Sequence, residues 1–194
     1  MKRNIIKMLF SMFFLIAICN VWADTVKVGT TSFSTTATVA NKPLVLNGAG
    51  MRVKLFHKVY TLGLYVPTKS NSPADLIQMA GPKLLLIQMV RDVDAKTFVK
   101  ALQEGLEDNN SRDTLDTLKP QIDQLEKLMV QTGTAKIGDV IKFEFNPSVG
   151  TQIIMNGKKL GLIGGGSDFY NAMLKIWLGK ESVDGDLKIS LLGG

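Results

Sequence analysis

Arg52 is the side chain whose position in this sequence most needs a chemical explanation. It follows a glycine turn in the segment LNGAGMRVKLFHKVYTLGLYVP, residues 46–67, among residues that otherwise suit the core of a sheet. A guanidinium keeps its charge and is costly to bury without a partner. An arginine on the solvent face of a half-buried sheet would need no partner. The spacing alone therefore leaves open whether Arg52 faces water or binds an anion.

Few other groups in the sequence could carry chemistry. His57 is the only histidine, and neither a cysteine nor an acidic cluster accompanies it, so a metal site is not expected. A serine triad would lack its second base, and no G-x-S-x-G elbow occurs. The glycines at 164–166 precede a predicted helix but lack the Lys-Ser/Thr pair of a phosphate loop. The sequence thus predicts no catalytic residue, no cofactor and no metal.

The first 23 residues have the three parts of a secretory signal peptide. A basic start is followed by the apolar run MLFSMFFLIAI and then by Ala23, before the polar Asp24. The apolar run has eleven residues, whereas a membrane-spanning helix needs about 20, which favours a cleaved signal over a retained anchor. We expect cleavage after Ala23, a periplasmic or otherwise secreted mature domain of residues 24–194, and no stable membrane anchor in that domain.

Cleavage would also change the charge and the cysteine content. It removes three basic residues and no acidic one, so the formal net charge falls from +6 to +3. No long run of Lys and Arg remains, which argues against nucleic acid as a partner. The only cysteine, Cys19, is removed as well, so the mature domain has no disulfide. A lipoprotein signal would need a small residue before Cys19, where the sequence has Ile18.

Hydrophobic periodicity predicts where the strands lie. The Ser/Thr-rich stretch TSFSTTAT at 31–38 suits an edge strand or an exposed ribbon. Residues 51–66 and the run PKLLLIQMV at 82–90 are typical of sheet. From Asp139 the period of two returns in VIKFEF, TQIIM and LGLIGGG, separated by the turn sequences NPSVG and NGKK. The second half of the chain therefore predicts an antiparallel meander.

Apolar residues at helical spacing predict the helices. Asp94 is a plausible N-cap for AKTFVKALQEGL, and Ser167 for DFYNAMLKIWLG. Between them an apolar stripe over residues 115–129 is interrupted by Pro120, which predicts that a new helix begins there. A short helix at 186–192 closes the chain. This order of elements predicts an α+β domain with helices on one face of an antiparallel sheet.

Three segments together resemble a known family. They are LNGAGMRVKLFHKVYTLGLYVP, DFYNAMLKIWLG and the tail WLGKESVDGDLKISLLG, and they are similar to the chalcone isomerase-like proteins, in particular to their secreted bacterial branch. The resemblance covers nearly the whole mature chain from about Leu44 onward. It implies an open-faced β-sandwich, in which a helical layer covers one face of a large antiparallel sheet and a ligand cleft lies between them.

The resemblance also implies which residues would line that cleft. Relative to the plant isomerases of the family, Arg52 matches the cleft arginine. The positions of a threonine, a tyrosine, an asparagine and a serine or threonine hold Tyr60, Thr97, Glu104 and Tyr170. Ring closure on a flavonoid needs polar donors that stabilise the developing enolate. These departures favour a binding protein, with an intramolecular lyase of the chalcone isomerase type on another substrate as the alternative.

Other members of the family bind fatty acids with an arginine and a tyrosine, a pair that Arg52 and Tyr60 would supply. The guanidinium can meet a carboxylate with two parallel hydrogen bonds, and the phenol adds one donor. The aliphatic tail would lie against side chains such as Phe98, Leu102, Phe169 and Met173. We therefore predict a non-catalytic binding protein for a small hydrophobic carboxylate such as a fatty acid, with ligand-binding residues Arg52, Tyr60, Thr97 and Tyr170. A structural or interaction protein without a ligand is the second alternative.

Arg52 and Tyr60 can meet on one ligand only if the chain reverses between them. On one straight strand they would be about 26 Å apart, at roughly 3.3 Å per residue. A two-residue turn at 57–58 would leave Arg52 on the opposite face. A three-residue connection at 56–58, or an equivalent bulge, would pair Arg52 with Leu62 and make Tyr60 its diagonal neighbour at roughly 7 to 8 Å. We predict the second arrangement, with Arg52 facing the helices and with Arg52→Ala weakening the binding of a fatty acid.

Overall fold

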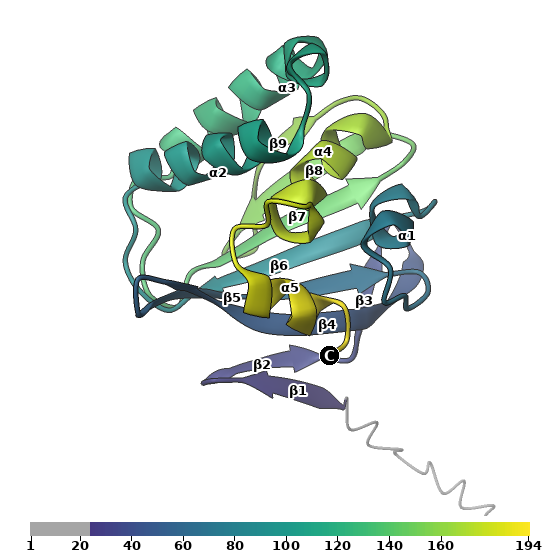
Figure 1. Ribbon diagram of the computed structural model, residues 1–194, viewed down its shortest axis with the longest axis vertical. Coiled ribbons are helices and arrows are strands. Elements are labelled where there is room, and N and C mark those ends of the chain that lie inside the picture. Colours follow the sequence, from purple (N-terminus) through teal and green to yellow (C-terminus); the bar gives the residue numbers. More distant parts are fainter. Residues whose placement is uncertain (1–23) are drawn as a thin grey trace, which may run out of the picture.

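The computed structural model describes residues 24–194, so the predicted signal peptide lies outside the described residues. The main feature is a seven-stranded antiparallel sheet in the order β3-β4-β5-β6-β7-β8-β9 (Figure 1). Each strand pairs with the next one along the chain. The strands are β3 (Thr36–Val39), β4 (Lys42–Lys54), β5 (His57–Val66), β6 (Lys83–Met89), β7 (Val140–Asn146), β8 (Gly150–Met155) and β9 (Lys158–Ile163). The predicted meander from Asp139 onward is confirmed.

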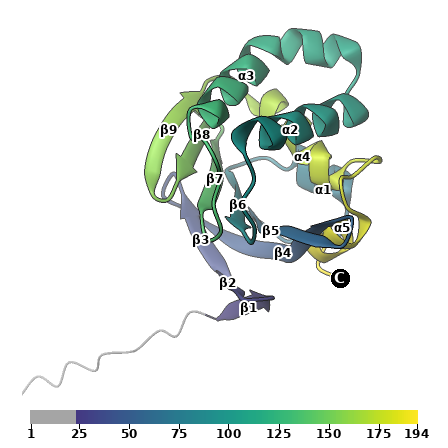
Figure 2. The same cartoon turned by 90° about the vertical axis from the view of Figure 1, so that its left-hand side faces the viewer.

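Five helices cover one face of this sheet within residues 24–194 (Figure 2). They are α1 (Pro73–Gln78), α2 (Ala95–Asn109), α3 (Arg112–Val130), α4 (Ser167–Leu178) and α5 (Gly185–Leu191). Alternate residues of the strands, such as Leu62, Leu64 and Ile87, point toward the helices and form the main core with α4. None of the helices in this part of the chain is long and apolar enough to cross a membrane. The predicted α+β class is confirmed.

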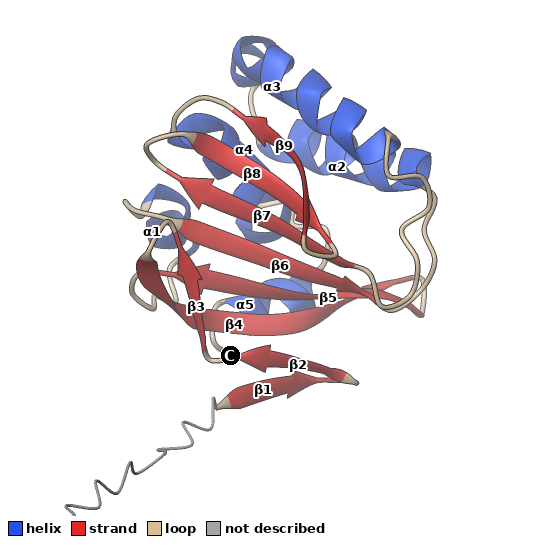
Figure 3. Ribbon diagram, turned by 180° about the vertical axis from the view of Figure 1, so that it is seen from behind, coloured by secondary structure: helices blue, strands red, loops and turns tan. Residues whose placement is uncertain are grey.

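A small ribbon covers part of the other face of the sheet. It consists of β1 (Thr25–Val28) and β2 (Thr31–Ser34), which pair only with each other (Figure 3). A second core lies beneath it, made of side chains that point away from the helices: Phe33, Val39, Leu44, Leu46, Tyr65 and Leu84. The stretch TSFSTTAT thus supplies both forms that its composition predicts, a ribbon strand in β2 and the edge strand β3 of the large sheet.

Two predictions about helix starts are wrong. Pro120 lies inside α3, which runs without a break from Arg112 to Val130. The proline is on the solvent side of the helix, so water can bond the carbonyl that loses its amide partner, while Leu118, Leu125 and Met129 stay packed in the core. At α4 the N-cap position is held by Gly166, and Ser167 is already the first helical residue.

The C-terminal helix α5 lies directly on β4. A side chain at Gly48 would run into the backbone of Ser190 and Leu191, so the glycine permits the close approach. The Nδ2 of Asn47 donates to the carbonyl oxygen of Leu191 at 2.7 Å and to that of Ser70 at 3.0 Å. These contacts fix the C-terminal end of α5 against the middle of β4.

Lys83 is a buried cation at the start of β6. Its side chain is 0 % exposed, and its Nζ donates to the carbonyl oxygen of Ile77 at 2.7 Å and to Oδ1 of Asn171 at 3.4 Å. Carboxylates form ion pairs with other cations in the described part of the chain, but none does with Lys83. Burial lowers the pKa of Lys83 from 10.5 to about 8.

We expect the free energy of unfolding to rise with pH between about 8 and 10. In the native state Lys83 releases its proton at a pKa of about 8, whereas the unfolded chain keeps it up to 10.5. The unfolded state therefore binds more protons in this window, so stability increases with pH there, by about 1 to 2 kcal/mol. Urea denaturation near pH 7 and near pH 9.5 measures the rise. It should vanish in Lys83→Met and persist in Lys69→Met, and a rise retained in Lys83→Met would contradict the assignment.

Candidate ligand-binding site

The β4–β5 hairpin brings Arg52 directly opposite Tyr60. Its turn is formed by Leu55 and Phe56, and the register then runs regularly until it shifts between Arg52 and Val53. Val59 is the extra residue in this bulge. Without the bulge Arg52 would oppose Val59, and Tyr60 would point to the other face, so the bulge is what places the two side chains together.

The predicted register is therefore wrong in detail. Leu62 pairs with Gly50 rather than with Arg52, and the chain reverses at 55–56 rather than at 56–58. The predicted side of the sheet is confirmed, because Arg52 bonds to Asp184 in the helical layer. The sequence does not reveal this turn, since Leu55 and Phe56 adopt φ values of 47° and 67° that turn glycines or asparagines normally supply.

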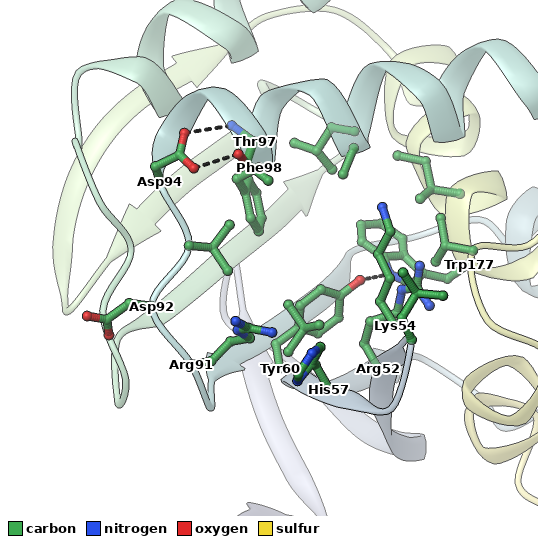
Figure 4. Close-up of a pocket in the computed structure, with 17 residues that line it drawn as sticks. Arg52, Lys54, His57, Tyr60, Arg91, Asp92, Asp94, Thr97, Phe98 and Trp177 are labelled. Atoms are coloured by element: carbon green, nitrogen blue, oxygen red, sulfur yellow. Dashed lines mark hydrogen bonds between the residues drawn. The ribbon is translucent and has the colours of Figure 1, made fainter.

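A cavity of about 430 Å³ lies between this end of the sheet and helices α2 and α4 (Figure 4). Its volume falls within the range of small-molecule sites, about 300 to 1,000 Å³. More than half of the side chains around it are apolar, and the polar ones come both from the hairpin and from the segment between β6 and α2. The lining includes Arg52, Val59 and Tyr60 from the sheet, Val93, Thr97, Phe98, Ala101 and Leu102 from α2 and the loop before it, and Ile176, Trp177 and Val183 from the C-terminal part.

Tyr60 offers a hydrogen-bond donor at the cavity wall. The Nε1 of Trp177 donates to the Tyr60 Oη at 2.8 Å. An indole nitrogen can only donate, so the phenolic proton of Tyr60 stays free for another acceptor. Burial raises the pKa of Tyr60 to about 12, against the opposing effects of Trp177 and of the Arg52 charge. The phenol therefore keeps its proton at neutral pH and can donate to an anion.

Arg52 is partly buried and only partly engaged. Its Nη1 donates to the carbonyl oxygen of Val53 at 2.7 Å and reaches Oδ2 of Asp184 at 3.5 Å. A guanidinium has five N–H donors, so these contacts leave most of its capacity available. Arg52 therefore combines a permanent positive charge with donors that can serve a ligand.

Asp184 is the acidic partner of Arg52, and most of its hydrogen-bonding capacity is used elsewhere. Oδ1 accepts from the amides of Asp186 and Leu187 at the start of α5, and Oδ2 accepts from the amide of Val53 at 2.9 Å. Burial alone would raise the pKa of Asp184, but these amides and the Arg52 charge lower it below its usual value. Asp184 thus remains ionised, and from the N-terminus of α5 it helps to hold the Arg52 side chain in place.

Further cations surround the opening of the cavity. Lys54 and Arg91 line it, while the two acidic residues in the lining are occupied by backbone amides. Asp92 accepts from the amide of Ile137 at 2.8 Å, and Asp94 accepts from that of Thr97 at 3.0 Å. The lining therefore carries three cations, Arg52, Lys54 and Arg91, beside two carboxylates that already accept hydrogen bonds from the backbone. Across residues 24–194 the side chains form no group of three or more His, Cys, Asp or Glu that could hold a metal ion.

The structure brings three of the four predicted ligand-binding residues to this cavity. Arg52, Tyr60 and Thr97 line it, although the Thr97 hydroxyl donates to Asp94 as part of the α2 N-cap. Tyr170 lies outside it, fully buried in the main core, where its Oη donates to the carbonyl oxygen of Phe143 at 3.2 Å. Its ring also stacks on Phe145, with the centroids 5.0 Å apart. Tyr170 therefore has a packing role in this structure.

Of the four apolar residues predicted to surround the ligand, two line the cavity and two do not. Phe98 and Leu102 line the cavity, whereas Phe169 and Met173 do not. Along α4, Phe169 and Met173 are buried in the main core, and only the last turn of the helix, with Ile176 and Trp177, reaches the cavity.

Sequence reasoning missed Trp177 and Asp184. The indole of Trp177 follows Phe169 and Met173 at helical spacing, which predicts a core residue, but its N–H also needs an acceptor when buried. Asp184 carries the signal of an N-cap before the last helix. Its contact with Arg52 spans 132 residues of sequence, so no local pattern could reveal it.

Fold and cavity together define an open-faced α+β sandwich with a ligand-sized space beneath its helices. The chain belongs to the chalcone isomerase-like family, whose model matches residues 25–193. Among solved structures, a fatty-acid binding protein of Arabidopsis thaliana is similar, with a TM-score of 0.66 and 16 % sequence identity over 87 % of this chain and 96 % of that one. At this identity the similarity establishes the fold. No curated protein sequence matches the chain.

Proposed function

We propose that this protein is a secreted, non-catalytic binding protein for a fatty acid. The observation that carries the proposal is the pairing of Arg52 with Tyr60 at the wall of a mostly apolar cavity of about 430 Å³. The similar Arabidopsis structure is described as a fatty-acid binding protein, which supports the same ligand class. The basic, apolar and small residues of the N-terminal 23 support export to the periplasm, and the resemblance in sequence supports the bacterial branch of the family.

The carboxylate would accept hydrogen bonds from Arg52 and from the phenol of Tyr60. Both donors belong to neighbouring strands, so they are held by the sheet and need little reordering. The hydrocarbon chain would lie toward Phe98, Leu102 and Ile176, where burial of each methylene contributes about 0.8 kcal/mol. In this arrangement Arg52 and Tyr60 select for a carboxylate. The apolar part of the cavity adds affinity for the hydrocarbon chain but does not distinguish between head groups.

A comparison of head groups tests this proposal. Delipidated protein should bind a saturated C16 fatty acid roughly tenfold or more tightly than the alcohol of the same chain length, because hydrogen bonds to a charged acceptor are worth about twice as much as neutral ones. Isothermal titration calorimetry below the micelle concentration measures both ligands. Equal affinities for the two ligands would show that Arg52 and Tyr60 do not bind the carboxylate. If neither ligand bound, the alternative of an interaction protein without a ligand would be favoured.

The same preparation separates binding from catalysis. Purified protein should not accelerate the cyclisation of a chalcone above the rate in buffer, because the positions of the polar cleft residues of the plant isomerases hold Tyr60, Thr97 and Tyr170 here, and Tyr170 lies outside the cavity. Turnover that is lost in Arg52→Ala would favour the lyase alternative instead.

Sequencing of the N-terminus of the exported protein, which should begin at Asp24, tests the proposed secretion.

A further inference from the structure

The end of the sheet at which the cavity opens also exposes large apolar side chains. At the tip of the β4–β5 hairpin, Leu55 is 79 % exposed and Phe56 is 100 % exposed. Ile137, in the loop before β7, is 68 % exposed. Its amide bonds Asp92 in the loop after β6, which also lines the cavity. Figure 1 shows the hairpin tip and both loops on the same side of the molecule.

The conformation of the hairpin tip does not explain why these residues are apolar. Leu55 and Phe56 both have positive φ, where a side chain is strained and where Asn or Gly would be preferred. Neither residue gains burial within the chain in return. A partner that takes up the two side chains would supply that missing burial.

Cations are spread along the same end of the sheet as the apolar tip. The strand ends and loops at this end carry exposed basic side chains: Lys54, Lys58, Arg91, Lys96, Lys136, Lys158 and Lys159. The acidic residues there are engaged locally, Asp92 and Asp94 as described above and Asp139 by the amide of Lys136 at 2.7 Å. Protruding apolar side chains within a basic rim are the composition that binds the interface of an anionic bilayer.

We propose that this end of the sheet docks on an anionic lipid bilayer, with Leu55 and Phe56 inserted among the head groups and the lysines against lipid phosphates. A bilayer fits better than a protein, because the apolar side chains sit on two separate loops among long, mobile cations. A stable protein interface needs about 1,000 Å² of complementary surface. Docking does not require the proposed fatty-acid function. It does place the cavity opening, which Lys54 and Leu55 line, at the lipid surface.

Vesicle sedimentation of the full chain tests the proposal. The wild type should bind vesicles of phosphatidylcholine and phosphatidylglycerol, and should bind vesicles of phosphatidylcholine alone much more weakly. Phe56→Ser should lower the partition coefficient roughly 10- to 100-fold, because it removes the aromatic side chain that would be buried among the lipid head groups. Lys58→Gln combined with Lys136→Gln should lower the partition coefficient on the order of 10-fold or more, since each cation near an anionic surface adds to the free energy of binding.

Val149→Ser is the matched control. Val149 is 51 % exposed in the β7–β8 turn, at the opposite end of the sheet, so its replacement should leave vesicle binding unchanged. Equal effects of Phe56→Ser and Val149→Ser, no binding by the wild type, or Phe56-dependent self-association without vesicle binding would each overturn the proposal. Fatty-acid affinity in solution should be the same in Phe56→Ser and the wild type. The docking and the proposed function can therefore fail separately.

Discussion

Arg52→Ala should weaken the binding of a long-chain fatty acid by about 1.5 to 3 kcal/mol, which is roughly 10- to 150-fold in the dissociation constant. The substitution removes the one cation that the hairpin bulge places beside Tyr60. The phenol would remain, but it offers a single neutral donor, and the nearby carboxylate of Asp184 would then face the ligand without a compensating charge. Titration of the delipidated variant with a C16 fatty acid gives the change directly.

Lys54→Ala is the matched control for this experiment. Lys54 also lines the cavity but is exposed, so water and salt screen its charge and its removal should cost well under 1 kcal/mol. Asp184→Asn should have the opposite sign and tighten binding, because it removes the negative charge next to Arg52. Equal losses of affinity in Arg52→Ala and Lys54→Ala would show that the carboxylate is attracted by the summed positive charge around the cavity opening and not by a specific contact with Arg52.

Gly48→Val should lower the free energy of unfolding by about 3 kcal/mol or more. A Cβ at this position would collide with the main chain of Ser190 and Leu191, and neither backbone can yield unless α5 lifts from β4. Because Asp184 caps α5, the same displacement would remove the acidic partner from Arg52. Urea denaturation measures the loss of stability.

Gly164→Val serves as the comparison. Gly164 follows β9, its φ is not positive, and an added Cβ would meet nothing within 4 Å. This substitution should therefore change the free energy of unfolding little. If both valine variants were equally stable, the close approach of α5 to β4 would not be a determinant of the fold.

The elements that the sequence predicted correctly are those defined by local periodicity. The alternation in VIKFEF and TQIIM reflects which side of a strand meets the core, and the Asp94 cap reflects the unpaired amides at a helix start. Both are short-range effects that the sequence displays directly. The side of the sheet on which Arg52 lies is different, because the spacing leaves it open and its prediction depends on the family resemblance.

The details that sequence reasoning missed depend on contacts between distant residues. The turn at Leu55 and Phe56 lacks the glycine or asparagine that normally marks such a turn, so the register could not be fixed to the residue. Tyr170 shares a buried helix face with cavity residues one or two turns later, and only tertiary packing separates core from cavity. Pro120 predicts a helix start from local propensity alone, whereas the apolar stripe packs in the core on both sides of it and keeps α3 continuous.

The order of the strands determines when during folding the two halves of the site meet. Strands of the large sheet pair with their neighbours along the chain, mostly through short turns, so their ends close at small entropic cost. The contacts of α5 with β4 join residues 132 and 144 positions apart, from Arg52 to Asp184 and from Asn47 to Leu191. Such distant contacts form late, after shorter loops have closed. We therefore expect the guanidinium of Arg52 to stay in water while the sheet assembles, and to gain its acidic neighbour only when α5 docks on β4.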